Sequence, residues 1–365
     1  MPDRSTTGTQ TNNADSFKTF LEGWMVRQEH YLDELLSAQQ HCHDMQDEDI
    51  KELSSRVLAH YQEYYEAKSR IAQRDIFLAF SPTWLTSFER TFLWIAGFKP
   101  GVVFRIVTNS VLDMSEDQTQ RMNRSTTGTQ TNNADSFKTF LEGWMVRQEH
   151  YLDELLSAQQ HCHDMQDEDI KELSSRVLAH YQEYYEAKSR IAQRDIFLAF
   201  SPTWLTSFER TFLWIAGFKP GVVFRIVTNS VLDMSEDQTQ RMNRLLEETK
   251  LEERALNDEL AKVHESMAGP TMLEAARRSV RLVDGEASEE ETAMATLRVA
   301  LESVVANADS LRMRTAMKVV EILRPAQKVS FLAGAAQLQL KIRSWGLQRQ
   351  EDKKETLHRH EAADL

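Results

Sequence analysis

The sequence contains few cysteines and no long apolar run. Only Cys42 and Cys162 occur in 365 residues; this number excludes a disulfide framework and fits a reducing compartment. No stretch of about 18 apolar residues is present, so we expect no membrane-spanning helix. The polar N-terminus lacks the apolar core of a signal peptide. Together these absences predict an intracellular chain without membrane contact.

Clustered positive charge is also missing. Asp and Glu outnumber Lys and Arg by 56 to 43, which gives a formal net charge of −13. Nucleic-acid binding depends on clustered Lys and Arg that contact the phosphates. We therefore expect no direct binding to nucleic acid. The length by itself suggests about two domains.

A long internal repeat is the main feature that the sequence does contain. Residues 5–124 recur without a single change as residues 125–244, so each position has a twin 120 residues further along the chain. Solenoid repeats are much shorter, which excludes a solenoid. The residues after 244 occur only once, so a domain that needs them can be complete only with one of the two copies.

The repeat, the local composition and the extent of a family resemblance over residues 136–346 together predict five segments. These are a disordered N-terminus (1–15), a duplicated half-domain without a partner (16–124), a linker (125–135), a complete domain (136–346) and a charged tail (347–365). A half-domain exposes apolar faces that its missing partner would cover. We expect the first copy to be loosely docked, partly unfolded or exchanged with a second chain.

The apolar residues predict an all-α fold, a multi-helix bundle. They recur at helical spacing and nowhere alternate with period two. One predicted helix face runs from Phe137 to Leu155 and includes Gln148, and another runs from Ile170 to Ile191 and includes Lys188. Residues 236–267 are predicted as one amphipathic helix, in which Thr249 and Glu253 interrupt a leucine-zipper register, and no basic region precedes it.

The stretch Ser201–Pro220, like its twin at 81–100, is dense in aromatic residues. Ser201 is a suitable N-cap and Pro202 suits a first helical turn, so a helix is predicted over 202–216. Gly217 is expected to supply its left-handed stop. The aromatic side chains of this helix should form part of the core.

Residues with catalytic or metal-binding chemistry are few and isolated. His41-Cys42-His43, repeated at 161–163, places its side chains on different faces of a helix. Glu355 and His358 have the spacing of carboxylate metal sites, but those sites need further helices. The sequence has no phosphate-binding loop and no nucleophile elbow. We predict no metal site, no catalytic residue and no enzymatic activity.

The stretch TWLTSFERTFLWIAGFKP (203–220) resembles the signature of the plant Delay-of-Germination domain, which also forms the C-terminal part of TGA-type bZIP transcription factors. The resemblance extends over Val177–Phe197, over Ala308–Gly334 and to the closing Ser344-Trp345-Gly346, and so covers nearly all of 136–346. The signature residues are Trp204, Glu209, Arg210, Phe212, Leu213, Trp214, Gly217, Pro220 and Trp345.

This resemblance implies a non-enzymatic plant regulator that binds other proteins in seed dormancy, abscisic-acid signalling or transcription, in the nucleus and cytoplasm. Expected partners are type 2C protein phosphatases, bZIP factors or a second copy of the chain. Two alternatives stay open. One is a TGA-like regulator that lacks its own bZIP segment and reaches DNA through a partner, and the other is a sensor of haem or lipid.

The family has two sites whose positions can be located here. Some members carry two His in the last helix that are implicated in haem binding. The matching residues here are Gln339 and Arg343, which are not usual haem ligands, so no cofactor is predicted. The family's phosphatase-binding motif is present in a form spread out around Gly143. The matching residues are Asp135, Ser136, Phe137, Leu141, Glu142 and Trp144, of which Leu141 and Trp144 also fit core positions.

Overall fold

The computed structural model describes residues 13–41, 46–98, 130–161, 165–269 and 287–363 and confirms the all-α class. The chain divides into two compact units. The first unit comprises residues 1–86 and 348–365, and the second comprises residues 87–347. The boundary at 86/87 falls inside the first copy of the repeat.

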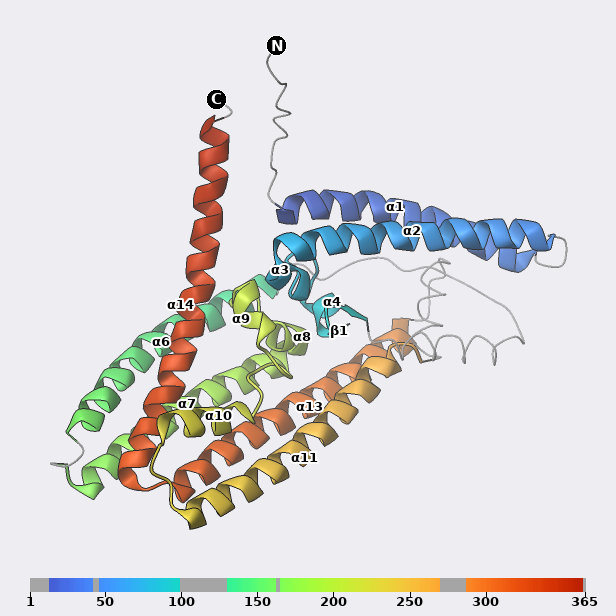
Figure 1. Cartoon of the computed structure of the whole chain (residues 1–365). Coiled ribbons are helices and arrows are strands. Elements are labelled where there is room, and N and C mark those ends of the chain that lie inside the picture. Colours follow the sequence, from blue (N-terminus) through green and yellow to red (C-terminus); the bar gives the residue numbers. More distant parts are fainter. Residues whose placement is uncertain (1–12, 42–45, 99–129, 162–164, 270–286, 364–365) are drawn as a thin grey trace. The chain divides into compact units, whose positions relative to one another are not determined.

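The first unit is built on an antiparallel helical hairpin (Figure 1). It contains α1 (Asn13–Gln40), α2 (Asp47–Arg74), α3 (Ile76–Phe80) and the end of α14 (Pro325–Ala363). The Trp24 ring stacks on His60 at 4.4 Å, and its indole N–H donates to the His60 carbonyl at 2.9 Å. The Arg349 guanidinium lies 4.6 Å from the centre of the Phe77 ring.

The second unit contains the complete domain. In chain order its elements are α4 (Ser87–Thr91), β1 (Leu93–Trp94), β2 (Gly97–Phe98), α6 (Gln130–Gln160), α7 (Asp167–Arg194), α8 (Ile196–Phe200), α9 (Ser207–Thr211), α10 (Val222–Ser230), α11 (Glu236–Ser266), α13 (Ala287–Ile322) and α14 as far as 347. The α6–α7 hairpin repeats α1–α2, and α11 runs beside α13 (Figure 1). Two apolar clusters join the repeated half to the later helices, one around Trp144 and Leu301 and one around Leu155 and Val319.

A short segment of the first copy packs inside the second unit. The Phe88 ring contacts Phe197 of α8 edge-on at 4.8 Å. Arg90 Nε donates to Ser201 Oγ at 2.8 Å, and Ser87 Oγ donates to the Ser201 carbonyl at 3.2 Å. Helix α4 therefore belongs structurally to the complete domain, although it comes from the first repeat.

The prediction of one helix over 202–216 is wrong. Only 207–211 form a helix, α9, which begins with a capping box between Thr206 and Glu209. The chain then turns, and Trp214 pairs with Gly217 as an isolated bridge. Ile215 and Ala216, at φ 44° and 60°, take the left-handed conformation that was expected of Gly217. Two adjacent residues with positive φ make a tight type I′ turn.

Contacts from α13 stabilise this turn, in which two non-glycine residues take the unfavourable left-handed conformation. Arg312 of α13 donates through Nη2 to the carbonyls of Trp214 and Ile215 and through Nε to that of Phe218. The side chains of Ile215 and Ala216 are buried. A Cβ at Gly217 would lie 2.8 Å from Arg312 Cζ, so this position requires glycine because of close approach.

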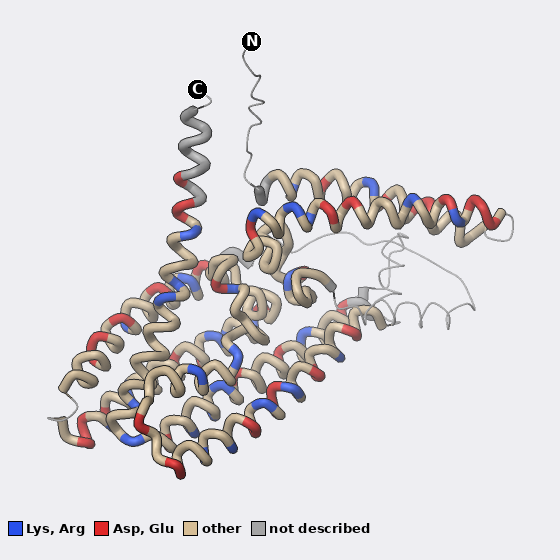
Figure 2. Tube along the Cα trace, in the orientation of Figure 1, with Lys and Arg blue, Asp and Glu red and all other residues tan. Residues whose placement is uncertain are grey.

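The predicted helix over 236–267 is confirmed as α11. Its polar interruptions are buried but satisfied. Thr249 Oγ1 donates to the Leu245 carbonyl at 2.8 Å, while Glu253 accepts from the Gly221 N–H at 2.7 Å and from Lys219 at 3.2 Å. Acidic and basic residues alternate along α11 and α13 (Figure 2), with Lys318 and Glu248 at 3.5 Å.

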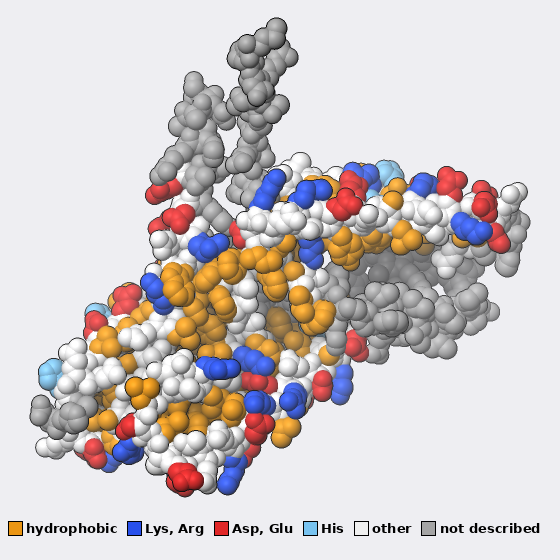
Figure 3. All heavy atoms as spheres, viewed as in Figure 1, with side chains coloured by type: hydrophobic (Ala, Val, Ile, Leu, Met, Phe, Trp, Pro, Cys, Tyr) orange, Lys and Arg blue, Asp and Glu red, His pale blue; other side chains and the backbone are white. Residues whose placement is uncertain are grey.

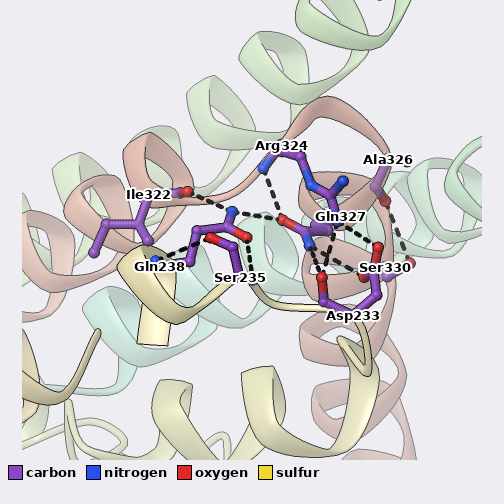
Figure 4. A network of polar contacts seen from close by, with 8 residues as sticks. All are labelled: Asp233, Ser235, Gln238, Ile322, Arg324, Ala326, Gln327 and Ser330. Carbon is purple, nitrogen blue, oxygen red and sulfur yellow. Dashed lines mark hydrogen bonds and ion pairs between the residues drawn. The ribbon is translucent and has the colours of Figure 1, made fainter. Parts of the chain in front are cut away.

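A polar network fixes the start of α11 to the turn between α13 and α14 (Figure 4). Gln238 Nε2 donates at 2.8 Å to the Ile322 carbonyl and to Gln327 Oε1. Gln327 in turn donates to Asp233 at 3.1 Å, and Arg324 also pairs with Asp233. Since Gln238 and Gln327 are buried, each bond made here avoids the cost of an unsatisfied amide.

Candidate functional site

A cavity of about 200 Å³ lies within the second unit, between α7, the α9–α10 segment and helices α13 and α14. Its wall is mostly apolar. The lining includes Leu178, Val223, Met313, Phe331 and Ile342. Both the repeated half and the single C-terminal half contribute to it. Apolar cavities with a few polar groups are the usual form of ligand sites.

Two charged residues that line the cavity, Lys188 and Arg312, share one carboxylate partner, Asp309. Lys188 Nζ lies 2.8 Å from Asp309 Oδ1, and Arg312 Nη1 lies 2.5 Å from the same oxygen. Lys188 is buried, and desolvation lowers its pKa to about 8, although the attraction of Asp309 opposes this shift. With all three groups ionised, this cluster carries one net positive charge, which would favour an anionic group nearby.

A second ion pair closes another part of the wall. Arg343 Nη1 donates to both carboxylate oxygens of Glu209, at 2.9 and 3.1 Å, and to the Trp204 carbonyl at 3.2 Å. Glu209 also accepts from the Thr206 N–H at 2.7 Å, as part of the α9 cap. The signature residue Glu209 therefore joins the start of α9 to α14.

Three polar side chains meet where α6, α7 and α14 converge. Gln148 Nε2 donates to the Tyr181 hydroxyl at 2.6 Å and to Gln339 Oε1 at 3.3 Å, and the Tyr181 hydroxyl donates to the same oxygen at 3.3 Å. Burial raises the pKa of Tyr181, so this hydroxyl stays protonated. Gln148 Oε1 is buried and has no hydrogen-bond partner in the part of the chain that the structure describes.

The two positions carried over from the haem-binding relatives do not fit that cofactor. Arg343 forms the ion pair with Glu209, and Gln339 accepts from Gln148 and Tyr181. Neither side chain is an imidazole, thiolate, thioether or phenolate, which are the groups that ligate haem iron.

The structure divides the phosphatase motif between core and surface. Phe137, Leu141 and Trp144 are buried, and the Trp144 ring stacks on His180 at 4.2 Å. The remaining residues, Asp135, Ser136 and Glu142, are exposed. A partner could reach only this exposed set without unfolding α6.

The residues of the family signature are divided among the core, the cavity wall and the surface. Trp204 is buried against Phe137, and Leu213, Gly217 and Pro220 line the cavity. Arg210 donates to the Pro202 carbonyl at 3.2 Å, and the Trp214 indole N–H donates to Asn257 at 2.8 Å. Phe212 and Trp345 are exposed.

No group of metal-ligating residues is present in the described residues. His41 and His161 each contact a backbone carbonyl four residues earlier, at 2.9 Å. The positions 42–43 and 162–163 and the side chain of His358 lie outside the description. Among the described helices, none is long and apolar enough to cross a membrane.

Comparison with known proteins places this architecture in a family. The family described as seed dormancy control matches twice, at residues 31–109 and 151–229. Protein ZW2 of Arabidopsis thaliana is 36% identical over 222 residues, which are 60% of this chain and 99% of ZW2. RESPONSE TO ABA AND SALT 1 of the same plant is 34% identical over 58% of this chain and 96% of its own length.

The chain belongs to the seed dormancy control family, as the resemblance of its signature indicated. Transcription factor TGA7 of Arabidopsis thaliana is 28% identical over 59% of this chain and 58% of TGA7. The chain is therefore a regulator of the plant Delay-of-Germination type. One whole relative spans about 60% of the chain, which leaves room for the extra repeat.

The sequence indicated one residue of the cavity wall, Lys188, and one residue, Gln148, that bonds to the wall residues Tyr181 and Gln339. Gln148 and Lys188 stand at core-facing positions of otherwise apolar helices, and such positions often mark buried polar networks. Asp309 and Arg312 gave no such signal, because their partners are far away in the sequence.

Proposed function

We propose that the chain is a non-enzymatic adaptor that binds regulatory proteins in dormancy or abscisic-acid signalling, in the nucleus and cytoplasm. The observation that supports this function is a surface of aromatic signature residues. Phe212 is 43% exposed and Trp345 is 44% exposed, and the Phe208 ring lies between them, at 5.1 Å from Phe212 and 6.4 Å from Trp345. We call Phe208, Phe212, Leu338 and Trp345 the aromatic patch.

The aromatic patch has the properties of a docking surface. Leu338 and Trp345 are seven residues apart on α14 and so lie on one face, and Lys341 lies 5.3 Å above the Trp345 ring. Exposed Trp and Phe side chains supply much of the binding energy in protein interfaces. Clustered exposure of this kind commonly marks an interaction site.

A bZIP transcription factor is the partner that we propose for the patch. The TGA relatives support a connection to transcription, and the net charge of −13 argues against direct contact with DNA. The chain would then reach DNA through its partner, as in the TGA-like alternative.

The test is a binding measurement between the purified chain and a TGA-type bZIP factor. Phe212→Ser and Trp345→Ser should each weaken binding at least tenfold. Leu232→Ser, at a position that is 92% exposed and outside the patch, should leave binding unchanged. Equal binding by all three variants would overturn the role of the patch.

Phosphatase capture is a separate proposal that uses the exposed part of the family motif. Asp135, Ser136 and Glu142 are accessible on α6. Glu142→Lys should reduce the binding of a type 2C phosphatase. The twin change Glu22→Lys tests whether the first copy of the repeat also binds the phosphatase. Unchanged binding in the double variant would overturn this proposal.

Ligand sensing is a second candidate function, supported by the cavity. Its apolar wall and its net positive cluster suit a slender lipid with an anionic head, held near Lys188 and Arg312. Ala335 lines the cavity, and Ala335→Phe would fill it.

Native mass spectrometry of the purified chain, with a saturated fatty acid added, tests this function. We expect one bound fatty acid, lost in Ala335→Phe and retained in Ala295→Phe at an exposed site of α13. Absence of binding to the unmodified chain, or equal binding by both variants, would overturn it.

A further inference from the structure

The two helical hairpins have the same sequence and the same internal contacts. Trp24 stacks on His60 at 4.4 Å, and Trp144 stacks on His180 at 4.2 Å. Each hairpin also carries the same Arg–Glu pair, at 2.9 Å in α1–α2 and at 2.8 Å in α6–α7. The conformation of the hairpin itself is therefore set locally.

The burial of one face differs strongly between the two hairpins. Leu155 is 0% exposed and its twin Leu35 is 39% exposed; Ile170 is 2% exposed and its twin Ile50 is 37% exposed. In α6–α7 this face joins a cluster with Val319 and other residues of α13 and α14. These later helices occur once per chain, so only one hairpin can pack against them in this way.

The first hairpin exposes large apolar side chains on both of its helices, and we call these side chains the unpaired face. It consists of Met25, Leu32 and Leu35 on α1 and Ile50, Leu58 and Tyr61 on α2. Figure 3 shows hydrophobic side chains gathered along this hairpin. Such a surface favours association in water.

The number of apolar hairpin faces per chain indicates what covers the unpaired face. Each chain has two hairpin faces and one C-terminal half. If the unpaired face captured the C-terminal half of a second chain, another hairpin face would lose its cover, and no apolar area would be gained. Two unpaired faces that pack on each other cover both. We propose that the chain forms a symmetric homodimer through the unpaired faces of α1 and α2.

The dimensions of the face are sufficient for a stable dimer. Each helix has 28 residues, so it is about 42 Å long, and two helices side by side present about 800 Å². A standard interface buries about 800 Å² per partner. The proposed contact therefore falls in the range of specific interfaces.

The charges on α2 favour an antiparallel arrangement. The first turn is acidic, with Asp47, Glu48 and Asp49, and the last turn carries Arg74. With a twofold axis perpendicular to the helices, both chains contribute the same surface to the interface, and the two α2 helices run in opposite directions. The acidic end of one α2 then lies near the basic end of the other, which stabilises this register.

Sedimentation equilibrium of the full chain tests the proposal. The unmodified chain should have twice the chain mass of 42.2 kDa. Leu58→Glu and Ile50→Glu should reduce it to 42.2 kDa, and because both positions are exposed, the helical circular dichroism should be unchanged. Val26→Glu is the control, since Val26 and its twin Val146 are both exposed outside the face; this variant should stay dimeric. A monomeric unmodified chain, or a dimer in Leu58→Glu, would overturn the proposal.

Cross-linking distinguishes the face-to-face dimer from an exchange of C-terminal halves. In a background with Cys42→Ser and Cys162→Ser, Leu58→Cys lies near the middle of α2 and should form a disulfide with its twin in the second chain. Leu178→Cys, which the chain's own later helices partly cover, should not. Cross-linking through Leu178→Cys alone would mean exchange and would overturn the face-to-face arrangement.

Discussion

Arg343 and Glu209 are 134 residues apart in the sequence, and Arg343 Nη1 lies 2.9 Å from Glu209 Oε2 in the structure. Both side chains are largely buried. Arg343 is thus a structural cation, which ties the last helix to the cap of α9. The pair joins the repeated half to the single half of the domain.

Removing one partner of this pair should destabilise the domain. Arg343→Ala leaves the Glu209 carboxylate buried without its cation, which costs about 3–5 kcal/mol of unfolding free energy. Urea unfolding measures the loss. Arg314→Ala breaks the exposed pair with Glu252 and should cost less than about 1 kcal/mol. Similar losses in the two variants would show that Glu209 does not need its partner.

In the Lys188–Asp309–Arg312 cluster, loss of the carboxylate should destabilise the domain more than loss of one cation. Asp309→Asn leaves two buried cations together, whereas Lys188→Met leaves the Asp309–Arg312 pair intact. We expect Asp309→Asn to lower the unfolding free energy by about 3 kcal/mol or more, and Lys188→Met to lower it less. The reverse order in urea unfolding would contradict this account of the cluster.

His180 should make the domain less stable at acidic pH. Burial, aided by Arg147, lowers its pKa from 6.5 to about 4. Between these values the unfolded chain binds a proton that the folded chain does not, so stability falls as pH drops from 6.5 to 4 and this contribution then levels off. The loss is at most about 3 kcal/mol. His180→Gln should show a smaller decrease between pH 7 and 4.5; an unchanged decrease would assign it to other groups.

Two helical glycines should respond in opposite directions to alanine. Nothing lies within 4 Å of a Cβ at Gly143, so Gly143→Ala should stabilise α6 by about 0.5–1 kcal/mol through helix propensity. A Cβ at Gly346 would overlap the Thr206 side chain at the α9 cap. Gly346→Ala should therefore lower the melting temperature, and Gly143→Ala should raise it. Stabilisation in both variants would show that α14 can move away from Thr206.

Sequence patterns predicted the long helices well and the aromatic stretch poorly. The helix predicted over 236–267 forms as α11, and its residues Leu256 and Val263, seven apart, are both buried. The stretch 202–216 has the same kind of spacing but folds into a short helix and a turn. Because Ile95 and Ala96 of the first copy take the same left-handed conformation, the turn is a local property, and the helical spacing of the aromatic residues does not reveal it.

The candidate cavity could be predicted only in part. Gln148 and Lys188 were visible as polar residues on apolar faces, but their partners Gln339 and Asp309 come from later helices. Spacing within one helix identifies a face, and it does not identify what packs against that face.

The repeat separates what the sequence by itself determined from what the tertiary structure decided. Both copies form the same hairpin and the same left-handed turn, with Ile95 at φ 46° and Ile215 at φ 44°, because identical residues have identical local preferences. Only the tertiary structure decided that Leu155 is buried and Leu35 is exposed. Burial depends on the surface that a distant segment supplies, and the chain contains that segment only once.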